Sequence, residues 1–104
     1  MKTLRRIFGR IFIRKGELSM NEIIDQYMSA YSKIWARCKE VTEHYYKAGL
    51  WIKGIHYISD FEIYDGTITI IEQSHGCDLE FSLEDFIDPQ KLEEAIRKDI
   101  KNED

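Results

Sequence analysis

The sequence predicts a small α+β protein whose elements follow the order α–β–β–β–α. Apolar residues recur at helical spacing over residues 20–48, and apolar and polar residues then alternate as in strands over residues 55–73. Asp88–Pro89 next supplies the start of a second helix. With 104 residues, 43% of them hydrophobic, and a single proline, the chain is expected to build one modest core.

The first helix is predicted from apolar residues at alternating spacings of four and three. This 3.5-residue period is typical of a long helix that packs lengthwise against another helix. Gly49 offers a C-terminal cap, so the helix should span residues 20–48. Three interpretations stay open: the protein's own core covers the whole stripe, part of the stripe covers the sheet and the rest meets a partner, or two copies pack along it as a homodimer. The stripe consists of Met20, Ile24, Tyr27, Tyr31, Ile34, Cys38, Val41, Tyr45 and Ala48.

A β-hairpin is predicted around Asp65–Gly66, a pair that favours the two-residue type I′ turn. Such a turn pairs Ile63 with Ile68 and Phe61 with Ile70, which places four apolar side chains on one face. The same alternation would turn Ile55 and Tyr57 toward that face as well. The opposite face would carry His56, Ile58, Asp60, Glu62 and Tyr64.

The third strand is predicted at Cys77–Ser82, after a tight turn at His75–Gly76. This turn would pair Phe81 with Ile70 and leave Asp60 and Glu80 on either side of Ile71. Glu72 falls on the inward parity, so we expect it at a sheet edge or with its carboxylate reaching water. A final helix should begin at Pro89 and run to about residue 101.

Residues 1–19 differ from the rest of the chain in charge. They hold six Lys or Arg and one acid, and the apolar residues between them follow helical spacing. One interpretation is a basic amphipathic arm for a membrane surface or nucleic acid. The other is an upstream extension, with Met20 as the natural start of a single domain over 20–104. The pattern Ser19-x-x-Glu22, which matches a capping box, opposes the second interpretation.

Residues 20–104 hold nine basic and eighteen acidic residues, a net charge of −9. This balance opposes direct binding to nucleic acid or to an anionic membrane, and favours attraction to a basic protein surface. On the predicted sheet the outward carboxylates would lie about 6.6 Å apart along a strand, comparable to neighbouring phosphates on one nucleic-acid strand. Solvation alone also explains such a face. The predicted protein-binding residues are Asp60, Glu62, Tyr64, Asp78, Glu80, Glu84 and Asp85.

Catalytic and metal-binding motifs are absent from the sequence, which predicts a protein that is not an enzyme and uses no cofactor. His75, Cys77 and Asp78 share one turn, but tetrahedral zinc needs a fourth ligand, and turn residues are the simpler interpretation. A small hydrolase using His75 or His44 is the remaining enzymatic alternative. Cys38 sits in the apolar stripe, so we expect a core residue, and two cysteines without a disulfide pattern favour the cytoplasm.

The hairpin through Tyr64–Thr67 and the stretch Ser-Leu-Glu-Asp-Phe-Ile-Asp-Pro at 82–89 complete an acidic chain with one long helix. In this general style residues 20–104 resemble small proteins of bacteriophages and mobile elements, among them anti-CRISPR and other anti-defence inhibitors. The resemblance implies an inhibitor that acts in the cytoplasm of a host bacterium. Its partner would be a host nuclease or another nucleic-acid-binding protein.

Overall fold

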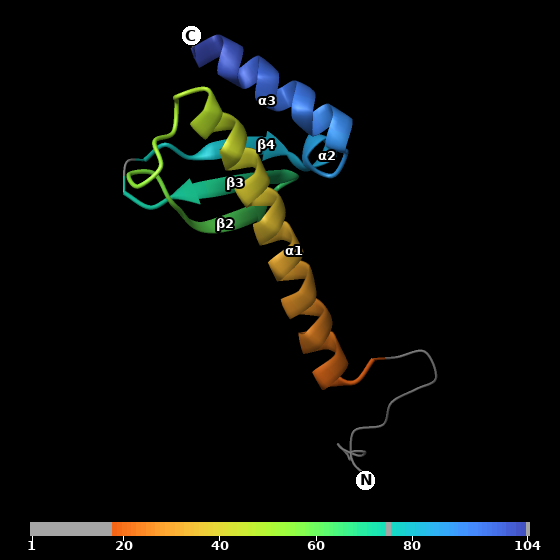
Figure 1. The fold of residues 1–104 in the computed structure, drawn as a ribbon. Helices are drawn as coiled ribbons and strands as arrows, with labels where there is room; N and C mark the ends of the chain where they lie inside the picture. The colour runs from red at the N-terminus through yellow and green to blue at the C-terminus, as the bar shows by residue number, and fades with distance from the viewer. Residues whose placement is uncertain (1–17, 75, 104) are drawn as a thin grey trace. The chain divides into compact units, whose positions relative to one another are not determined.

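The structure is a computed structural model that describes residues 18–74 and 76–103. It confirms the α+β class, with a three-stranded antiparallel sheet in the order β2-β3-β4 and helices before and after it (Figure 1). The chain divides into two compact units, Met1–Lys33 and Ile34–Asp104. The elements are α1 (Met20–Lys47), β2 (Ile58–Tyr64), β3 (Thr67–Glu72), β4 (Leu79–Ser82), α2 (Leu83–Phe86) and α3 (Pro89–Glu103).

The described part of the first unit is the beginning of α1 with its cap. Ser19 and Glu22 form the predicted capping box: the Glu22 N–H donates to Ser19 Oγ at 3.1 Å, and the Ser19 N–H donates to Glu22 Oε1 at 2.9 Å. Both bonds satisfy backbone donors that a helix start leaves unpaired. All side chains from residue 21 to 30 are exposed. The remaining residues of the predicted basic arm, 1–17, lie outside the described residues.

In the second unit, one face of the sheet packs against helices. Ile68 and Ile70 on β3 are fully buried and belong to one cluster with Val41 of α1 and with Leu92 and Ile96 of α3. Each of these positions follows the period of its own element, two in the strand and three or four in the helices. Both helices therefore cover the same face, which leaves the outward parity of each strand on the other side.

The β2–β3 hairpin has the predicted turn and register. Asp65 and Gly66 both take positive φ angles, 53° and 75°, as a type I′ turn requires. Ile63 pairs with Ile68 and Phe61 with Ile70. The hairpin is therefore confirmed from its turn as far as Asp60.

The start of β2 corrects the prediction. The strand begins at Ile58 instead of Ile55, and a register shift between Ile58 and Asp60 marks a bulge. The extra residue moves Ile58 opposite Glu72 and lets it pack against the core, although strict alternation would have turned it outward. Residues before the strand instead form a turn, in which the His56 N–H donates to the Ile52 carbonyl at 2.9 Å.

The predicted β3–β4 register is wrong by two residues. Phe81 pairs with Ile68 instead of Ile70, so that Leu79 lies opposite Ile70. The cause lies in Asp78, whose Oδ1 accepts the Glu72 N–H at 2.9 Å and takes the place of a strand carbonyl. The connection then occupies residues 73–78 instead of a two-residue turn; His75 of that turn lies outside the described residues.

Glu72 is also a correction, because it lies on the central strand with only 4% of its surface exposed. Its Oε1 accepts the Ser74 N–H at 3.2 Å. A buried carboxylate requires such donors, since burial removes its water. Glu72 thus holds the connection after β3 instead of adding to the acidic surface.

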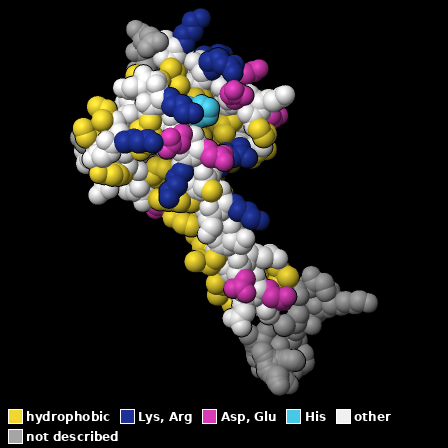
Figure 2. Space-filling model, viewed as in Figure 1, with side chains coloured by type: hydrophobic (Ala, Val, Ile, Leu, Met, Phe, Trp, Pro, Cys, Tyr) yellow, Lys and Arg dark blue, Asp and Glu magenta, His cyan; other side chains and the backbone are white. Residues whose placement is uncertain are grey.

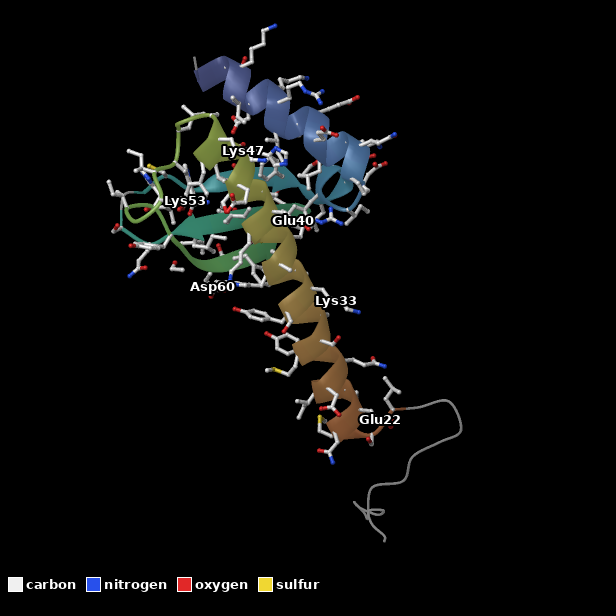
Figure 3. The ribbon with its side chains drawn as sticks, in the orientation of Figure 1. Glu22, Lys33, Glu40, Lys47, Lys53 and Asp60 are labelled. Carbon is white, nitrogen blue, oxygen red and sulfur yellow. The ribbon has the colours of Figure 1, made fainter. Side chains whose placement is uncertain are left out.

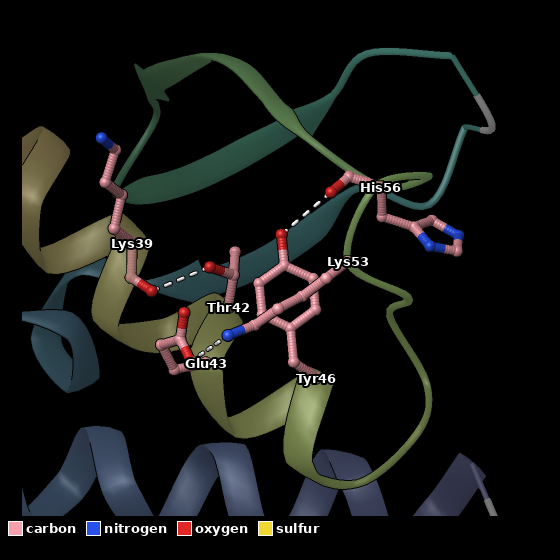
Figure 4. A network of polar contacts seen from close by, with 6 residues as sticks. All are labelled: Lys39, Thr42, Glu43, Tyr46, Lys53 and His56. Atoms are coloured by element: carbon pink, nitrogen blue, oxygen red, sulfur yellow. Dashed lines mark hydrogen bonds and ion pairs between the residues drawn. The ribbon is translucent and has the colours of Figure 1, made fainter.

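The segment between α1 and β2 is held by aromatic residues and their hydrogen bonds (Figure 4). Trp51 is buried and stacks on His56, with ring centroids 5.7 Å apart, and His56 Nδ1 accepts the Ile52 N–H at 2.8 Å. The Tyr46 hydroxyl donates to the His56 carbonyl at 2.9 Å, and Lys53 lies over the Tyr46 ring. These contacts fix where the chain enters β2.

α1 ends one residue before the predicted boundary, in a Schellman motif. Gly49 takes a φ of 79°, while its N–H and that of Leu50 donate to the carbonyls of Tyr46 and Tyr45. At the other end of the sheet, the Asp88 carboxylate accepts the N–H groups of Gln90 and Lys91 and caps α3 as predicted. Within the described ranges, the helices lack the combination of length and apolarity that crossing a bilayer requires.

We expect Gly49→Ala to destabilise the protein by about 1 kcal/mol, because a Cβ at positive φ is strained although the space beside it is open. Gly49→Asn should recover part of the loss, since Asn tolerates this conformation better. Urea unfolding monitored by Trp fluorescence measures both changes. Equal stability of Gly49→Ala and the unchanged protein would contradict the described cap.

The capping box predicts an acid-sensitive helix start. Hydrogen bonds from the backbone and side chain of Ser19 hold the pKa of Glu22 below its ordinary value of 4.5. The contribution of this carboxylate is therefore complete above pH 4.5 and is lost as the pH falls through the lowered pKa. Circular dichroism at 222 nm should show Glu22→Gln with less helix than the unchanged protein at pH 7, and the difference should shrink below that pKa, where Glu22 is itself neutral. A difference independent of pH would contradict the pairing.

Candidate protein-binding site

The face of the sheet opposite the helices, which we call the open face, carries the outward side chains of all three strands. Its centre is β3, where Thr67, Thr69 and Ile71 are each partly exposed. In one cross-strand row Thr69 lies between Glu62 of β2 and Glu80 of β4. The predicted row, with Asp60 and Glu80 on either side of Ile71, does not form because of the shifted β3–β4 register.

The charge of the open face is negative without interruption along the strands. β2, β3 and β4 contain no Lys or Arg, as their sequences ISDFEIY, TITIIE and LEFS show. Glu62 and Glu80 are exposed, make no ion pair with any described residue, and belong to strands two spacings apart, or about 10 Å. Asp60 lies two residues from Glu62 along β2, about 6.6 Å away. Three carboxylates thus share one face.

Two of the predicted aspartates also accept local hydrogen bonds. Asp60 Oδ1 accepts the Phe61 N–H at 2.8 Å, which orients the carboxylate beside the bulge. Asp78 is exposed, but its Oδ1 is engaged by the Glu72 N–H. Asp78 therefore has a structural role at the end of β3, which the prediction of a purely outward carboxylate missed.

Tyr64 lies at the hairpin end of the open face. It pairs with Thr67, whose other neighbour is Ser82, and 79% of its surface is exposed. An exposed tyrosine beside carboxylates provides apolar area and a hydroxyl for a partner protein. The open face therefore combines charge with one large aromatic side chain.

Glu84 and Asp85 lie outside the sheet, on the short helix α2 that follows β4 directly. Glu84 is exposed, and its Oε2 lies 3.8 Å from Lys91 Nζ, which partly neutralises it. Asp85 donates its N–H to Ser82 Oγ, the N-cap of α2. These two residues border the strands and contribute less to the acidic surface than Glu62 and Glu80 do.

The helical side of the second unit has mixed charge. Figure 2 views this side, and Lys and Arg side chains alternate there with Asp and Glu over α1 and α3. Ion pairs join Arg97 to Glu93 and Lys53 to Glu43. Glu40, Lys47 and Lys53 are labelled in Figure 3 on this side, while Asp60 belongs to β2. By contrast, the charged side chains of the three strands are all acidic.

A groove of about 470 Å³ between α1 and α3 was missed by the sequence analysis. Val41, Leu92 and Ile96 supply its apolar lining, with His44 and Glu40 among the polar residues. Arg37, also in the lining, donates to the Phe86 carbonyl at 3.0 Å. No local pattern could have revealed the groove, because its two walls lie about fifty residues apart in sequence. The groove is lined by both His44 and Glu40, and no Ser, Thr or Cys belongs to its described lining.

The thiols differ in environment. Cys38 is fully buried, and desolvation raises the pKa of its thiol to about 11, so it is protonated at neutral pH. This is the core residue predicted from the apolar stripe. Cys77 is exposed. In the part of the chain that the structure describes, no three His, Cys, Asp or Glu side chains gather as metal ligands would; His75 lies outside it.

Comparisons of the chain with protein families, with curated proteins and with solved structures return no match. The candidate site therefore rests on its geometry and charge.

We expect Cys77 and Cys38 to react with a thiol reagent at very different rates. At pH 8 a disulfide reagent such as DTNB should modify one thiol of the native protein quickly and the second only after urea unfolding. Cys77→Ser should remove the fast phase, whereas Cys38→Ala should remove the slow one. Fast modification of Cys38 in the native state would contradict its burial.

Proposed function

We propose that the protein is a non-enzymatic, phage-type inhibitor whose open face docks on a basic nucleic-acid-binding groove of a host defence or nucleic-acid enzyme. The observation that carries the proposal is the set of three carboxylates, Asp60, Glu62 and Glu80, on a sheet face whose strands contain no basic residue. A surface that binds phosphates by Lys and Arg would attract this face in the same way.

The geometry supports a rigid recognition surface. Each carboxylate projects from a hydrogen-bonded strand, and the opposite side of that sheet is packed into the core. Little ordering of the backbone would accompany binding, which limits the entropic cost of association. The carboxylates would mainly accelerate association and orient the partner, while Tyr64 would supply apolar contact.

Docking through the open face can be tested with two variants that have the same net charge. The first reverses the open face, Asp60→Lys, Glu62→Lys and Glu80→Lys; the control reverses three exposed acids elsewhere, Asp25→Lys, Glu40→Lys and Glu94→Lys. Immobilised protein is exposed to the fraction of a bacterial lysate that binds DNA-cellulose. The unchanged protein and the control should retain the same partner, and the open-face variant should lose it. Retention by the open-face variant, or equal loss by both, would refute the proposal.

Once a partner is isolated, its affinity should fall steeply with salt, because exposed charges are screened within about 8 Å at 0.15 M ionic strength. Duplex DNA should compete for the partner. Tyr64→Ala should raise the Kd by about tenfold or more if the tyrosine is an anchor. A salt-independent affinity would indicate an apolar interface and would contradict docking through the carboxylates.

A further inference from the structure

The first half of α1 carries an exposed apolar stripe that the proposed function does not use. Five of its side chains have between 45% and 63% of their surface exposed, and Tyr31 is partly exposed. Figure 2 shows hydrophobic side chains gathered along one side of this part of the helix. We call this set the helix stripe; it consists of Met20, Ile23, Ile24, Tyr27, Met28 and Tyr31.

The stripe is continuous and carries no charge. At about 100° per residue, its members and Ala30 fall within an arc of about 160°. The remaining arc holds all the charged side chains between positions 20 and 33, which are Glu22, Asp25 and Lys33. A helix with such a wide apolar side normally buries it against another element. Contiguous exposed apolar side chains, unlike single scattered ones, mark interaction surfaces.

From this stripe we propose that α1 of a second copy of this chain covers it, in an antiparallel pair. Its spacing of four and three residues repeats every 3.5 positions, the period of helices that pack lengthwise on each other. The same surface on both copies gives the isologous contact that closes a two-fold dimer. This inference does not depend on the proposed function.

The antiparallel direction follows from side-chain size. With Ile24 opposite Tyr27 of the second copy, Tyr31 falls opposite Met20, so each layer pairs one aromatic with one aliphatic side chain. At the margins Ile23 would face Ala30, again a large residue against a small one. A parallel pair would instead place Tyr27 on Tyr27 and Tyr31 on Tyr31, and would align the two helix dipoles. Alternating sizes fill the layers more evenly.

Charge distinguishes a second copy from other occupants. The full chain has a net charge of −4 and residues 20–104 have −9, so net charge does not draw two copies together. The helix stripe lets them meet through uncharged side chains. A membrane surface fits less well, because helices that bind anionic lipid have Lys or Arg along their polar face. Here that face has two acids and one lysine.

The oligomeric state of the full chain tests the proposal. Sedimentation equilibrium at micromolar concentrations should show a dimer. Ile24→Lys should raise its Kd by about 100-fold or more, since it would bury two unpaired charges. Gln26→Lys, on the polar arc, is the matched control and should leave the dimer intact. A monomeric protein, equal effects of both variants, or a monomer that sediments with phosphatidylglycerol vesicles would overturn the inference.

Disulfide cross-linking tests the direction in a Cys77→Ser background. Ile24→Cys mixed with Tyr27→Cys should give a covalent dimer of the two different chains under mild oxidation, because these positions face each other. Ile24→Cys alone should cross-link poorly. Efficient cross-linking of Ile24→Cys with itself would indicate a parallel pair and overturn the antiparallel assignment.

Discussion

Burial of one side of the sheet is the constraint on which the rest of the second unit depends. Ile68 and Ile70 each contribute about 1.5–3 kcal/mol by leaving water, and they can do so only when α1 and α3 cover the same face. Since strand residues alternate, this burial forces the neighbouring positions to the opposite side. The open face is thus a direct consequence of the core, and its carboxylates cannot leave it without breaking the core register.

The acids of this protein fall into two structural groups, those that accept backbone hydrogen bonds and those that project from the sheet. Asp78, Glu72 and Asp88 accept backbone N–H groups at the ends of strands and helices, where regular hydrogen bonding stops. Glu62 and Glu80 make no such bonds with described residues and project from the middle of their strands. A high content of Asp and Glu therefore does not translate directly into acidic surface, and the candidate site is smaller than the net charge suggests.

The two proposed surfaces would reinforce each other. Pairing through the helix stripe would present two open faces on one particle, and two linked faces bind a two-site target more tightly than either alone. Because the stripe is uncharged and the open face is acidic, the two associations would rest on different kinds of contact. The two surfaces are also separate in the sequence: the helix stripe lies within residues 20–31 and the acids of the open face within residues 60–80.

Structure that depends on neighbours a few residues apart was determined by the sequence itself. The capping box at Ser19, the type I′ turn at Asp65, the cap at Asp88 and the helical period of α1 all follow from contacts within about one turn, and the structure contains each of them. The pairing of Phe61 with Ile70 followed too, because a two-residue turn leaves a single register.

Only the tertiary structure decided the positions at which several groups could take the same hydrogen bond or the same place in the core. The Glu72 N–H takes the Asp78 carboxylate instead of a strand carbonyl, which moves the β3–β4 register by two residues and replaces Ile71 by Thr69 between the open-face acids. The bulge near Ser59 turns Ile58 to the core because apolar burial outweighs strict alternation. Which arrangement forms depends on the packing of the whole unit. Local periodicity therefore predicts the face of the sheet on which a carboxylate lies, but not the residues that lie beside it on the neighbouring strands.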